Sequence, residues 1–444
     1  MTRRLHAFFC CAAEPLNLAV LRIAVFAWLL WLFVSIDFST YTQLPPQLRV
    51  APPGYAGFFH LIPWNDAFVS AVRAVAIIAS VAALLGWATR SAALVVCLCC
   101  LYLLGLPEFF GKIDHTHHHF VWVTALLAAS RSGDALSIDA WRAAMRRAEG
   151  GEPPTAPSAS IAYALPLRFV WLLIGLSYLF PGLAKLAVGP AWVFSDNLAQ
   201  IMHGFWLTKG FTPALRIDRY PLVMRSAAAA IVVFEVGFLP ALFFPRLRPL
   251  AVAAGVAFHL LTVIYLRIAF SGLLLCYVAF VDWAALLAAA RRRFVVHRTP
   301  ARALSASERR PSIRGVVWVG SLLLAANLLC GVLDIDSWPF GVFPRFTGAP
   351  RLEYTALEVV VRQPDGATRP IDTGLRSIAL QSLLRDDQAV RLAALREFVA
   401  THRVELQPGE SLQLFEVTRS TVPEDRDKEP LRRTLLSQLD AAAQ

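Results

Sequence analysis

A lysine at position 185 has unusual surroundings for a charged residue. The chain of 444 residues contains only four lysines against 38 arginines, and Lys185 follows the largely apolar run Tyr178-Leu-Phe-Pro-Gly-Leu-Ala. Burial can lower the pKa of a lysine until it is a free amine at neutral pH, which arginine does not permit. Such an amine can act as a general base. The alternative is a lysine at a helix end whose ammonium group reaches water.

Two further ionisable side chains interrupt apolar runs. His259 lies in Ala257-Phe-His-Leu-Leu, and Glu235 lies near the middle of another run. A buried neutral histidine can donate one hydrogen bond and accept another, so it can orient a quinol or a carboxylate. The alternative is a ring satisfied by a backbone carbonyl or a neighbouring helix. Charges inside a membrane are costly unless they are paired, so we expect Glu235 to form a structural ion pair with Arg73 or Arg22.

Histidines gather in the tract Asp114-His-Thr-His-His-His119, at the start of a short apolar run. A histidine-rich tract can bind zinc or copper. However, consecutive histidines on a helix point in different directions, and no matching set of cysteines or carboxylates accompanies them. We therefore expect no metal, and favour a hydrogen-bonding histidine in a pocket at this face. The residues considered for that pocket are His117, His118, His119, Trp192, His203 and His60.

The composition indicates which elements must position these groups. Hydrophobic residues make up 57% of the chain and charged residues 16%, against about 45–50% and about 25% in soluble domains. This excludes an ordinary soluble enzyme, a disordered protein and a disulfide scaffold. A spanning helix needs about 20 mostly apolar residues. We predict an all-α polytopic bundle with about nine spans, at 16–36, 67–86, 92–110, 118–131, 164–185, 226–245, 249–266, 271–290 and 315–333. The fourth run is short, so it either begins near Ile113 or lies partly sunk in the protein.

The arginine distribution predicts the orientation of the bundle. If the amino terminus is cytoplasmic, the arginine-rich segments 131–168 and 291–314 also fall inside, as the positive-inside rule requires. The net charge of +11 then reflects cytoplasmic loops and membrane lipid, and we expect no nucleic-acid partner. Heavy use of alanine and arginine points to a bacterium with a GC-rich genome, and hence to its inner membrane. Segment 186–225 is too polar to span, and we expect it to be an interfacial or re-entrant stretch.

The composition changes again near the end of the chain. We divide the sequence into a bundle at 1–290, a basic cytoplasmic linker at 291–314, a last span at 315–333 and a small periplasmic α+β domain at 334–444. Within the last domain we predict a hairpin, a second strand and two helices. Their ranges are 354–361 with 368–372, 406–418, 377–402 and 430–443. This domain is expected to bind a periplasmic protein or peptide, or else to contribute to a substrate site.

Several of these segments carry a family resemblance. The stretch from His118 through Phe-Val-Trp-Val to Asp134-Ala-Leu-Ser-Ile-Asp139 resembles a block of the vitamin K-dependent γ-carboxylase family, whose bacterial branch is the horizontally transferred transmembrane domain, HTTM. Tyr178-Leu-Phe-Pro-Gly-Leu-Ala-Lys185-Leu, followed by Trp192, is similar to a second block. Phe258-His259 before Arg267-Ile-Ala-Phe-Ser is similar to a third. The opening Pro15-Leu-Asn-Leu-Ala-Val-Leu-Arg22 is similar to the family's first helix. The resemblance covers roughly residues 14–290.

The resemblance implies a specific chemistry. In the carboxylases, a reduced quinone is deprotonated and reacts with oxygen, and the strong base so formed removes a γ-proton from glutamate, which then captures carbon dioxide. Carried over, Lys185 is the base that deprotonates the quinol, and His118 and His259 hold the quinol or an intermediate. The cofactor is then a vitamin K-type quinol or menaquinol, with oxygen and carbon dioxide as co-substrates.

The resemblance has limits that leave a second reading open. Thr262 stands where the family often has asparagine, and segment 334–444 does not resemble the large luminal domain of the animal enzymes. The alternative is a non-catalytic scaffold that binds lipid or quinone and presents the periplasmic domain to a partner. In either reading, Glu235 and Arg73 are weaker candidates for the pocket.

Overall fold

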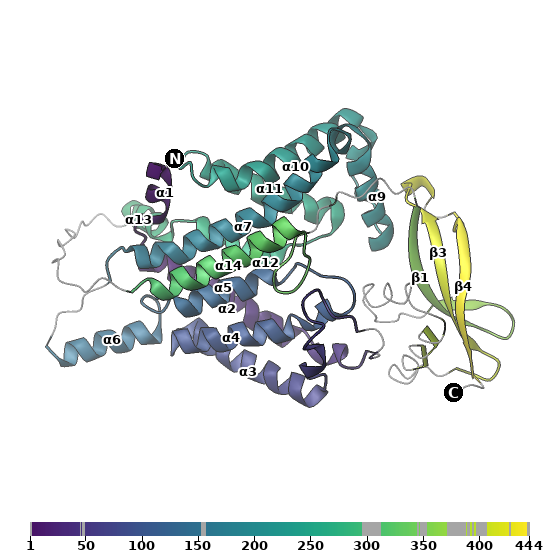
Figure 1. Ribbon diagram of the computed structural model, residues 1–444, viewed down its shortest axis with the longest axis horizontal. Helices are drawn as coiled ribbons and strands as arrows, with labels where there is room; N and C mark the ends of the chain where they lie inside the picture. Colours follow the sequence, from purple (N-terminus) through teal and green to yellow (C-terminus); the bar gives the residue numbers. More distant parts are fainter. Residues whose placement is uncertain are drawn as a thin grey trace.

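A computed structural model describes residues 2–44, 46, 49–151, 157–294, 312–343, 346, 353–370, 388, 391–392, 395–396, 406–425 and 428–441. The helices run along one another in a bundle, and an antiparallel sheet lies beyond one end of it (Figure 1). The expected combination of a helical membrane bundle and a small carboxy-terminal domain is confirmed. The basic linker falls mostly outside the described residues.

Among the described residues, seven helical segments are long and apolar enough to cross a membrane. They are α2 (Pro15–Ser35), α3 (Asp66–Leu85), α4 (Thr89–Leu103) with η4 (Leu106–Phe109), α7 (Ile161–Val188), α10 (Pro221–Ala241), α11 (Arg248–Leu266) and α14 (Arg314–Leu333). Each matches a predicted span to within a few residues, because continuous apolar runs of this length have few alternatives in a membrane. The chain is therefore an integral membrane protein.

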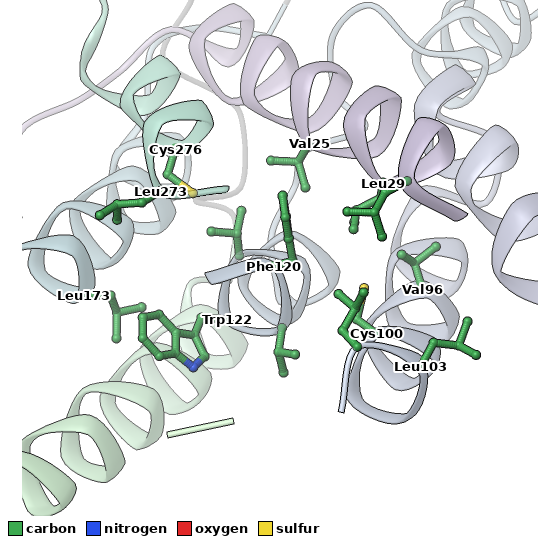
Figure 2. Packing of buried hydrophobic residues seen from close by; sticks show 14 of the residues in the cluster. Val25, Leu29, Val96, Cys100, Leu103, Phe120, Trp122, Leu173, Leu273 and Cys276 are labelled. Carbon is green, nitrogen blue, oxygen red and sulfur yellow. The ribbon is translucent and has the colours of Figure 1, made fainter. Parts of the chain in front are cut away.

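The predicted span at 118–131 is a shorter helix. Helix α5 (His118–Ala129) has 12 residues, a length of about 18 Å against the ~30 Å of a bilayer core. Its side chains pack against the surrounding helices, and Figure 2 shows Phe120 and Trp122 of α5 between α2, α4, α7 and α12. The run is apolar because it lies within the protein, which hydropathy alone does not distinguish from contact with lipid.

The predicted span at 271–290 is broken. Helix α12 (Ser271–Cys276) continues into η6 (Tyr277–Phe280), and α13 (Trp283–Phe294) leaves at an angle of 62°. Asn17 of α2 holds the break, because its Nδ2 donates to Asp282 Oδ1 at 3.1 Å and its Oδ1 accepts from the Ala284 amide at 3.0 Å. Within the described ranges, the nine predicted spans thus become seven, or eight if the bent pair is one span.

Helix α7 is largely buried and packs against α10 and α14. Its glycines allow this close approach. A Cβ atom at Gly182 would lie 2.9 Å from the Glu235 Cβ, and one at Gly175 would lie 2.6 Å from Leu239 Cδ1, both on α10. Small residues at such seams let membrane helices approach closely. The seam brings the carboxyl-terminal end of α7 directly against α10.

The remaining helices lie toward the two ends of the bundle. Helices α1 (Thr2–Phe9) and α6 (Ile138–Glu149) lie at the end away from the sheet, whereas α9 lies at the sheet end (Figure 1). Segment 186–225 contains no spanning helix and forms α8 (Ala191–Phe194), α9 (Asn197–Lys209) and η5 (Ile217–Arg219) before α10 begins. Short helices η1 (Phe38–Tyr41) and η3 (Phe59–Leu61) lie between α2 and α3.

The terminal sheet has four antiparallel strands in the order β2-β1-β3-β4. They are β1 (Glu353–Arg362), β2 (Thr368–Pro370), β3 (Ser411–Ser420) and β4 (Arg432–Asp440), with η7 (Pro423–Asp425) between the last two. The predicted hairpin is confirmed, with Val360 opposite Pro370. The predicted strand at 406–418 is also present, beginning at Ser411.

The helix predicted at 430–443 is wrong, because Arg432–Asp440 is strand β4. It pairs along β3, with Leu439 opposite Leu412 and both side chains buried. This pairing overrides the helical preference of the leucines in this segment. The helix predicted at 377–402 lies outside the described residues, apart from 388, 391–392 and 395–396.

Candidate functional site

Lys185 and Glu235 form a buried ion pair between α7 and α10. The Lys185 Nζ donates to both carboxylate oxygens of Glu235, at 2.9 and 2.8 Å, and the side chains are 2% and 6% exposed. Lys185 lies one turn after Gly182, so the glycine seam sets the two groups opposite each other. Among the described residues these hydrogen bonds are the ones that the ammonium group makes.

This pairing corrects the expectation that Glu235 pairs with Arg73 or Arg22. Arg73 instead donates to the carbonyls of Phe33 and Val34 at the end of α2, at 2.7 and 2.8 Å. Arg22 donates to the Ser132 and Leu136 carbonyls, at 2.8 and 2.5 Å. Both arginines therefore satisfy backbone carbonyls at chain reversals, which is a common role for a cation at a helix end.

Trp192 of α8 covers the pair. Its ring centroid lies 5.4 Å from Lys185 Nζ, and its indole Nε1 donates to the Phe346 carbonyl at 2.9 Å. The side chain is 2% exposed. A cation over an aromatic face is stabilised by the ring quadrupole, and more so without water. The structure thus brings Trp192 next to Lys185, and the indole of Trp192 bonds to Phe346, which follows α14.

A chain of hydrogen-bonded side chains lies two helical turns before Lys185 on α7. The Tyr178 hydroxyl bonds to His259 Nε2 on α11 and lies 2.8 Å from the Tyr277 hydroxyl of η6. Gly255 makes room for it, because a Cβ atom there would overlap the Tyr277 hydroxyl. Tyr178 and Tyr277 are functional candidates that sequence reasoning missed. The signal available in the sequence was the separation of seven residues between Tyr178 and Lys185, which places both side chains on one face of a helix.

His259 keeps one ring nitrogen for another partner. It is 2% exposed, and its Nδ1 makes no hydrogen bond among the described residues. Thr262, one turn further along α11, donates its hydroxyl to the His259 carbonyl at 2.8 Å and so does not satisfy the ring. A neutral imidazole has one donor and one acceptor nitrogen. The ring can therefore bind Tyr178 on one side and present Nδ1 to a ligand.

The histidines at the start of α5 have different surroundings. His115 Nε2 bonds to Asp336 Oδ1 at 2.6 Å, and the buried His118 ring lies 4.8 Å from the Trp338 ring. Neither nitrogen of His118 makes a hydrogen bond of good geometry, although the ring faces the Pro339 carbonyl. His117 is partly exposed and stacks on Phe120.

His119 is a further buried histidine at the start of α5. It is 2% exposed, and neither of its ring nitrogens is hydrogen-bonded among the described residues. Its ring lies 5.0 Å from Trp122 and 5.1 Å from Phe343. Leaving a buried polar atom unpaired costs about 1–3 kcal/mol. The orphaned nitrogens of His118, His119 and His259 are therefore candidates to bind a polar ligand.

Not all predicted residues meet here. His203 bonds to Asp218 at 3.0 Å, outside the buried pair, and His60 is exposed. Lys185 makes no hydrogen bond to His118 or His259 in the described part of the chain. Within the same described ranges, no group of three or more histidine, cysteine or acidic side chains is arranged to hold a metal ion.

These features define a class of protein: a polytopic helical membrane protein with a buried lysine–carboxylate pair beside a tyrosine–histidine chain. The family model described as the HTTM domain matches residues 12–282. The chain therefore belongs to the HTTM domain family. No curated protein and no solved structure matches it.

Proposed function

We propose that this membrane protein is a quinol-dependent carboxylase or oxygenase in which Lys185 is the base that deprotonates the quinol. The observation that carries the proposal is the buried Lys185–Glu235 ion pair, which Trp192 covers and which lies in the helical bundle of an HTTM domain. Ionisable groups inside a membrane protein are costly to maintain and usually serve a function. A plain helix-end anchor would have its ammonium group in water, whereas Lys185 is 2% exposed.

The surroundings fit a quinone in chemical type. A quinone head is a flat apolar ring with two polar oxygens. The rings of Trp122 and Phe343 lie beside His119, and His119 and His259 each have imidazole nitrogens without hydrogen bonds among the described residues. Those two histidines would hold the oxygens. When bound, the reduced quinone would supply the electrons for the reaction with oxygen, and carbon dioxide would be the group captured.

The pair can deliver a neutral amine without a net change in charge. In an interior of low dielectric, the proton between Lys185 Nζ and Glu235 can reside on either group, and the two titrate as one unit. Transfer of that proton to Glu235 leaves a neutral amine and a neutral acid. The amine then accepts a proton from a phenolic hydroxyl and becomes an ammonium ion again, opposite the anion that it has made. Arginine does not release its proton in this way.

Tyr178 is proposed to fix the orientation of His259. Its hydroxyl connects His259 Nε2 to the Tyr277 hydroxyl, so the ring is held in one plane and one tautomer. The free Nδ1 then has a defined direction. In this proposal Tyr178 and Tyr277 are positioning residues, whereas Lys185, His119 and His259 contact the ligand, with His118 behind them.

The site is proposed to face the periplasm of a bacterial inner membrane. Lys185 lies near the end of α7 that is on the same side as α9 and the sheet, while arginine-bearing α6 lies at the opposite end (Figure 1). By the positive-inside rule, α6 and the amino terminus are proposed to face the cytoplasm. The outer edge of β4 is unpaired among the described residues, so the sheet is proposed to accept an extended periplasmic peptide.

The test uses the full chain in lipid nanodiscs with reduced menaquinone or vitamin K, oxygen, bicarbonate and glutamate-rich peptides. Mass spectrometry measures the quinone epoxide. The wild type is compared with Lys185→Arg and with Lys209→Arg, the same exchange at an exposed position. We expect epoxide from the wild type and Lys209→Arg, and at least a hundredfold less from Lys185→Arg. Equal epoxide from all three folded proteins would overturn the role of Lys185.

A scaffold without catalysis is the second candidate, favoured by one observation. Glu235 already satisfies Lys185 with two short hydrogen bonds, as a purely structural pair would. That candidate predicts that Lys185→Arg leaves folding and quinone or lipid binding unchanged, and that none of the three proteins forms epoxide.

A further inference from the structure

A cleft of about 860 Å³ lies at the end of the bundle opposite the sheet. Its walls are the start of α4, the Ser130–Asp134 turn after α5, and one face of α6. It is remote from Lys185, which lies at the sheet end of α7. Nothing in the proposed reaction uses this cleft.

The cleft exists because α6 is anchored at its first turn. The Asp139 amide donates to the Gly86 carbonyl at 2.9 Å, and the Asp139 carboxylate accepts from Ala88 and Thr89. Beyond that turn, the face of α6 toward the cleft consists of Ala140, Ala143 and Ala144, followed by Arg147. These residues repeat at helical spacing, and small alanines leave the space open.

Three arginines from separate elements line the cleft: Arg90 of α4, Arg131 of the turn and Arg147 of α6. Arg90 donates from Nε and Nη2 to the carbonyls of Ser130 and Ala129, at 2.9 and 3.1 Å, so its Nη1 makes no hydrogen bond within the described ranges. Arg131 uses Nε toward Asp134 at 2.6 Å. A guanidinium group has five donors, and its planar fork matches phosphate oxygens.

The two carboxylates in the cleft already have partners. Asp134 accepts from Arg131 and, at 2.6 Å, from the Tyr163 hydroxyl. Burial raises the pKa of Asp139, but the hydrogen bonds from Thr89 and Ala88 outweigh it and leave the pKa below its usual value. Asp139 is therefore charged and bound to the amino terminus of α4. Among the described residues that line the cleft, three arginines stand against two aspartates, a formal charge of +1.

The position of the cleft indicates the source of its ligand. Helix α3 ends at Leu85 and α4 begins at Thr89, so the cleft lies where two apolar helices reach the membrane surface. Trp87 and Trp141 nearby are 51% and 62% exposed, and exposed tryptophans favour the lipid headgroup region. We propose that this cleft binds the phosphate group of an anionic phospholipid.

The test measures the thermal unfolding of the purified full chain in detergent with added phosphatidylglycerol, phosphatidylcholine or inorganic phosphate. Arg147→Gln and Arg131→Gln remove cleft charges, whereas Arg146→Gln removes the neighbouring α6 charge, which does not line the cleft. We expect phosphatidylglycerol to raise the Tm of the wild type and of Arg146→Gln, with about fivefold weaker apparent affinity for each cleft variant.

Three outcomes would overturn the lipid site. Equal losses in Arg146→Gln and Arg147→Gln would indicate general surface charge. A Tm rise with phosphatidylcholine equal to that with phosphatidylglycerol would show that the cleft does not recognise the headgroup charge. A rise with inorganic phosphate as large as with phosphatidylglycerol would assign the cleft to a soluble anion. Arg131→Gln decides the matter if Arg147→Gln does not fold.

Discussion

At the scale of single residues, Lys185 and Glu235 depend on each other for their tolerance of burial. Each is the other's counter-charge at 2.8–2.9 Å, in a place with almost no access to water. Removing one partner leaves a buried charge uncompensated, which costs about 3–5 kcal/mol, whereas replacing both by apolar groups is often nearly neutral.

A double-mutant cycle tests this dependence. We expect Lys185→Met and Glu235→Leu each to lower the free energy of unfolding by about 3–5 kcal/mol, and the double variant to lower it by less than either. The measurement is unfolding by sodium dodecyl sulfate in mixed micelles. Additive losses in the double variant would contradict a mutual pair.

Tyr178→Phe tests the hydrogen-bonded chain. The change removes one oxygen and leaves His259 Nε2 and the Tyr277 hydroxyl without their shared partner. We expect a loss of about 1–3 kcal/mol in the free energy of unfolding. Tyr220→Phe, at a side chain that is 61% exposed, is the matched control and should be neutral. Equal stability of the two variants would argue against the chain.

At this scale the sequence predicted which residue types matter better than how they pair. Lys185, His259 and Trp192 could be named because a lysine, a histidine and a tryptophan stood in or beside apolar runs. The partner of Glu235 could not be named, because pairing depends on which helices are neighbours. Gly182 determines this neighbourhood by allowing the close contact of α7 with α10. Tyr277 could not be predicted as a partner either, because it lies in a short 3₁₀ segment whose direction no periodicity predicts.

At the scale of elements, the glycines at the contact between α7 and α10 position the Lys185–Glu235 pair. Gly182→Ala places a methyl group 2.9 Å from Glu235 Cβ and 3.0 Å from the Val236 amide, so the helices must separate. We expect a loss of about 1–3 kcal/mol, measured by the same unfolding assay. Gly237→Ala on α10 meets nothing within 4 Å and should be neutral or slightly stabilising. If Gly182→Ala behaves like Gly237→Ala, the seam does not position the pair.

An ion-pair chain joins the bundle to the sheet domain. Asp218 accepts from Arg216 at 2.8 and 2.7 Å and from His203 at 3.0 Å, and Arg216 also contacts Glu424 of η7 at 3.2 Å. Burial raises the pKa of Asp218, but these hydrogen bonds outweigh it and lower the pKa below its usual 3.8. A lowered carboxyl pKa stabilises the folded state above pH 3.8, and this contribution is lost as the pH falls through the lowered value.

The expected consequence is a pH step in the contact of the sheet domain with η5. Hydrogen exchange of the Glu424 and Asp425 amides in η7 should be slow and constant from pH 7 to about 5, after correction for intrinsic rates, and should increase below pH 3.8. Asp218→Asn should remove the step, and Glu429→Gln, at an exposed carboxylate, should retain it. A step of unchanged size in Asp218→Asn would assign it to other groups.

Helices that follow from long apolar runs could be predicted from the sequence. Elements whose type or position depends on tertiary contacts could not. Helix α5 has the composition of a span but lies inside the protein, and Asp282 breaks another run because Asn17, 265 residues away, binds it. Strand β4 has helical residues but a strand partner in β3. In each case, a neighbour distant in sequence decides the outcome.

At the scale of the whole molecule, the two ends of the bundle differ in charge and in contents. The arginine-lined cleft and α6 occupy one end, and the buried pair, α9 and the sheet occupy the other (Figure 1). This asymmetry predicts that Glu149 of α6 faces the cytoplasm and Glu429 of the sheet domain faces the periplasm.

Reporter cysteines in a Cys10→Ser background test this topology, since Cys10 is the exposed native thiol. In intact spheroplasts, a membrane-impermeant maleimide should label Glu429→Cys and leave Glu149→Cys unlabelled until the membrane is opened. The opposite pattern would reverse the bundle and place the proposed reaction site at the cytoplasmic surface.

The most direct test of the account is chemical rescue of the base. Lys185→Ala removes the amine and leaves space beside Glu235 and Trp192. In the nanodisc assay, ethylamine should restore epoxide formation in proportion to the concentration of its unprotonated form, while guanidinium, which keeps its proton, should restore none. Equal rescue by both cations, or rescue that ignores the free-base concentration, would show that Lys185 supplies charge alone and would contradict its assignment as the base.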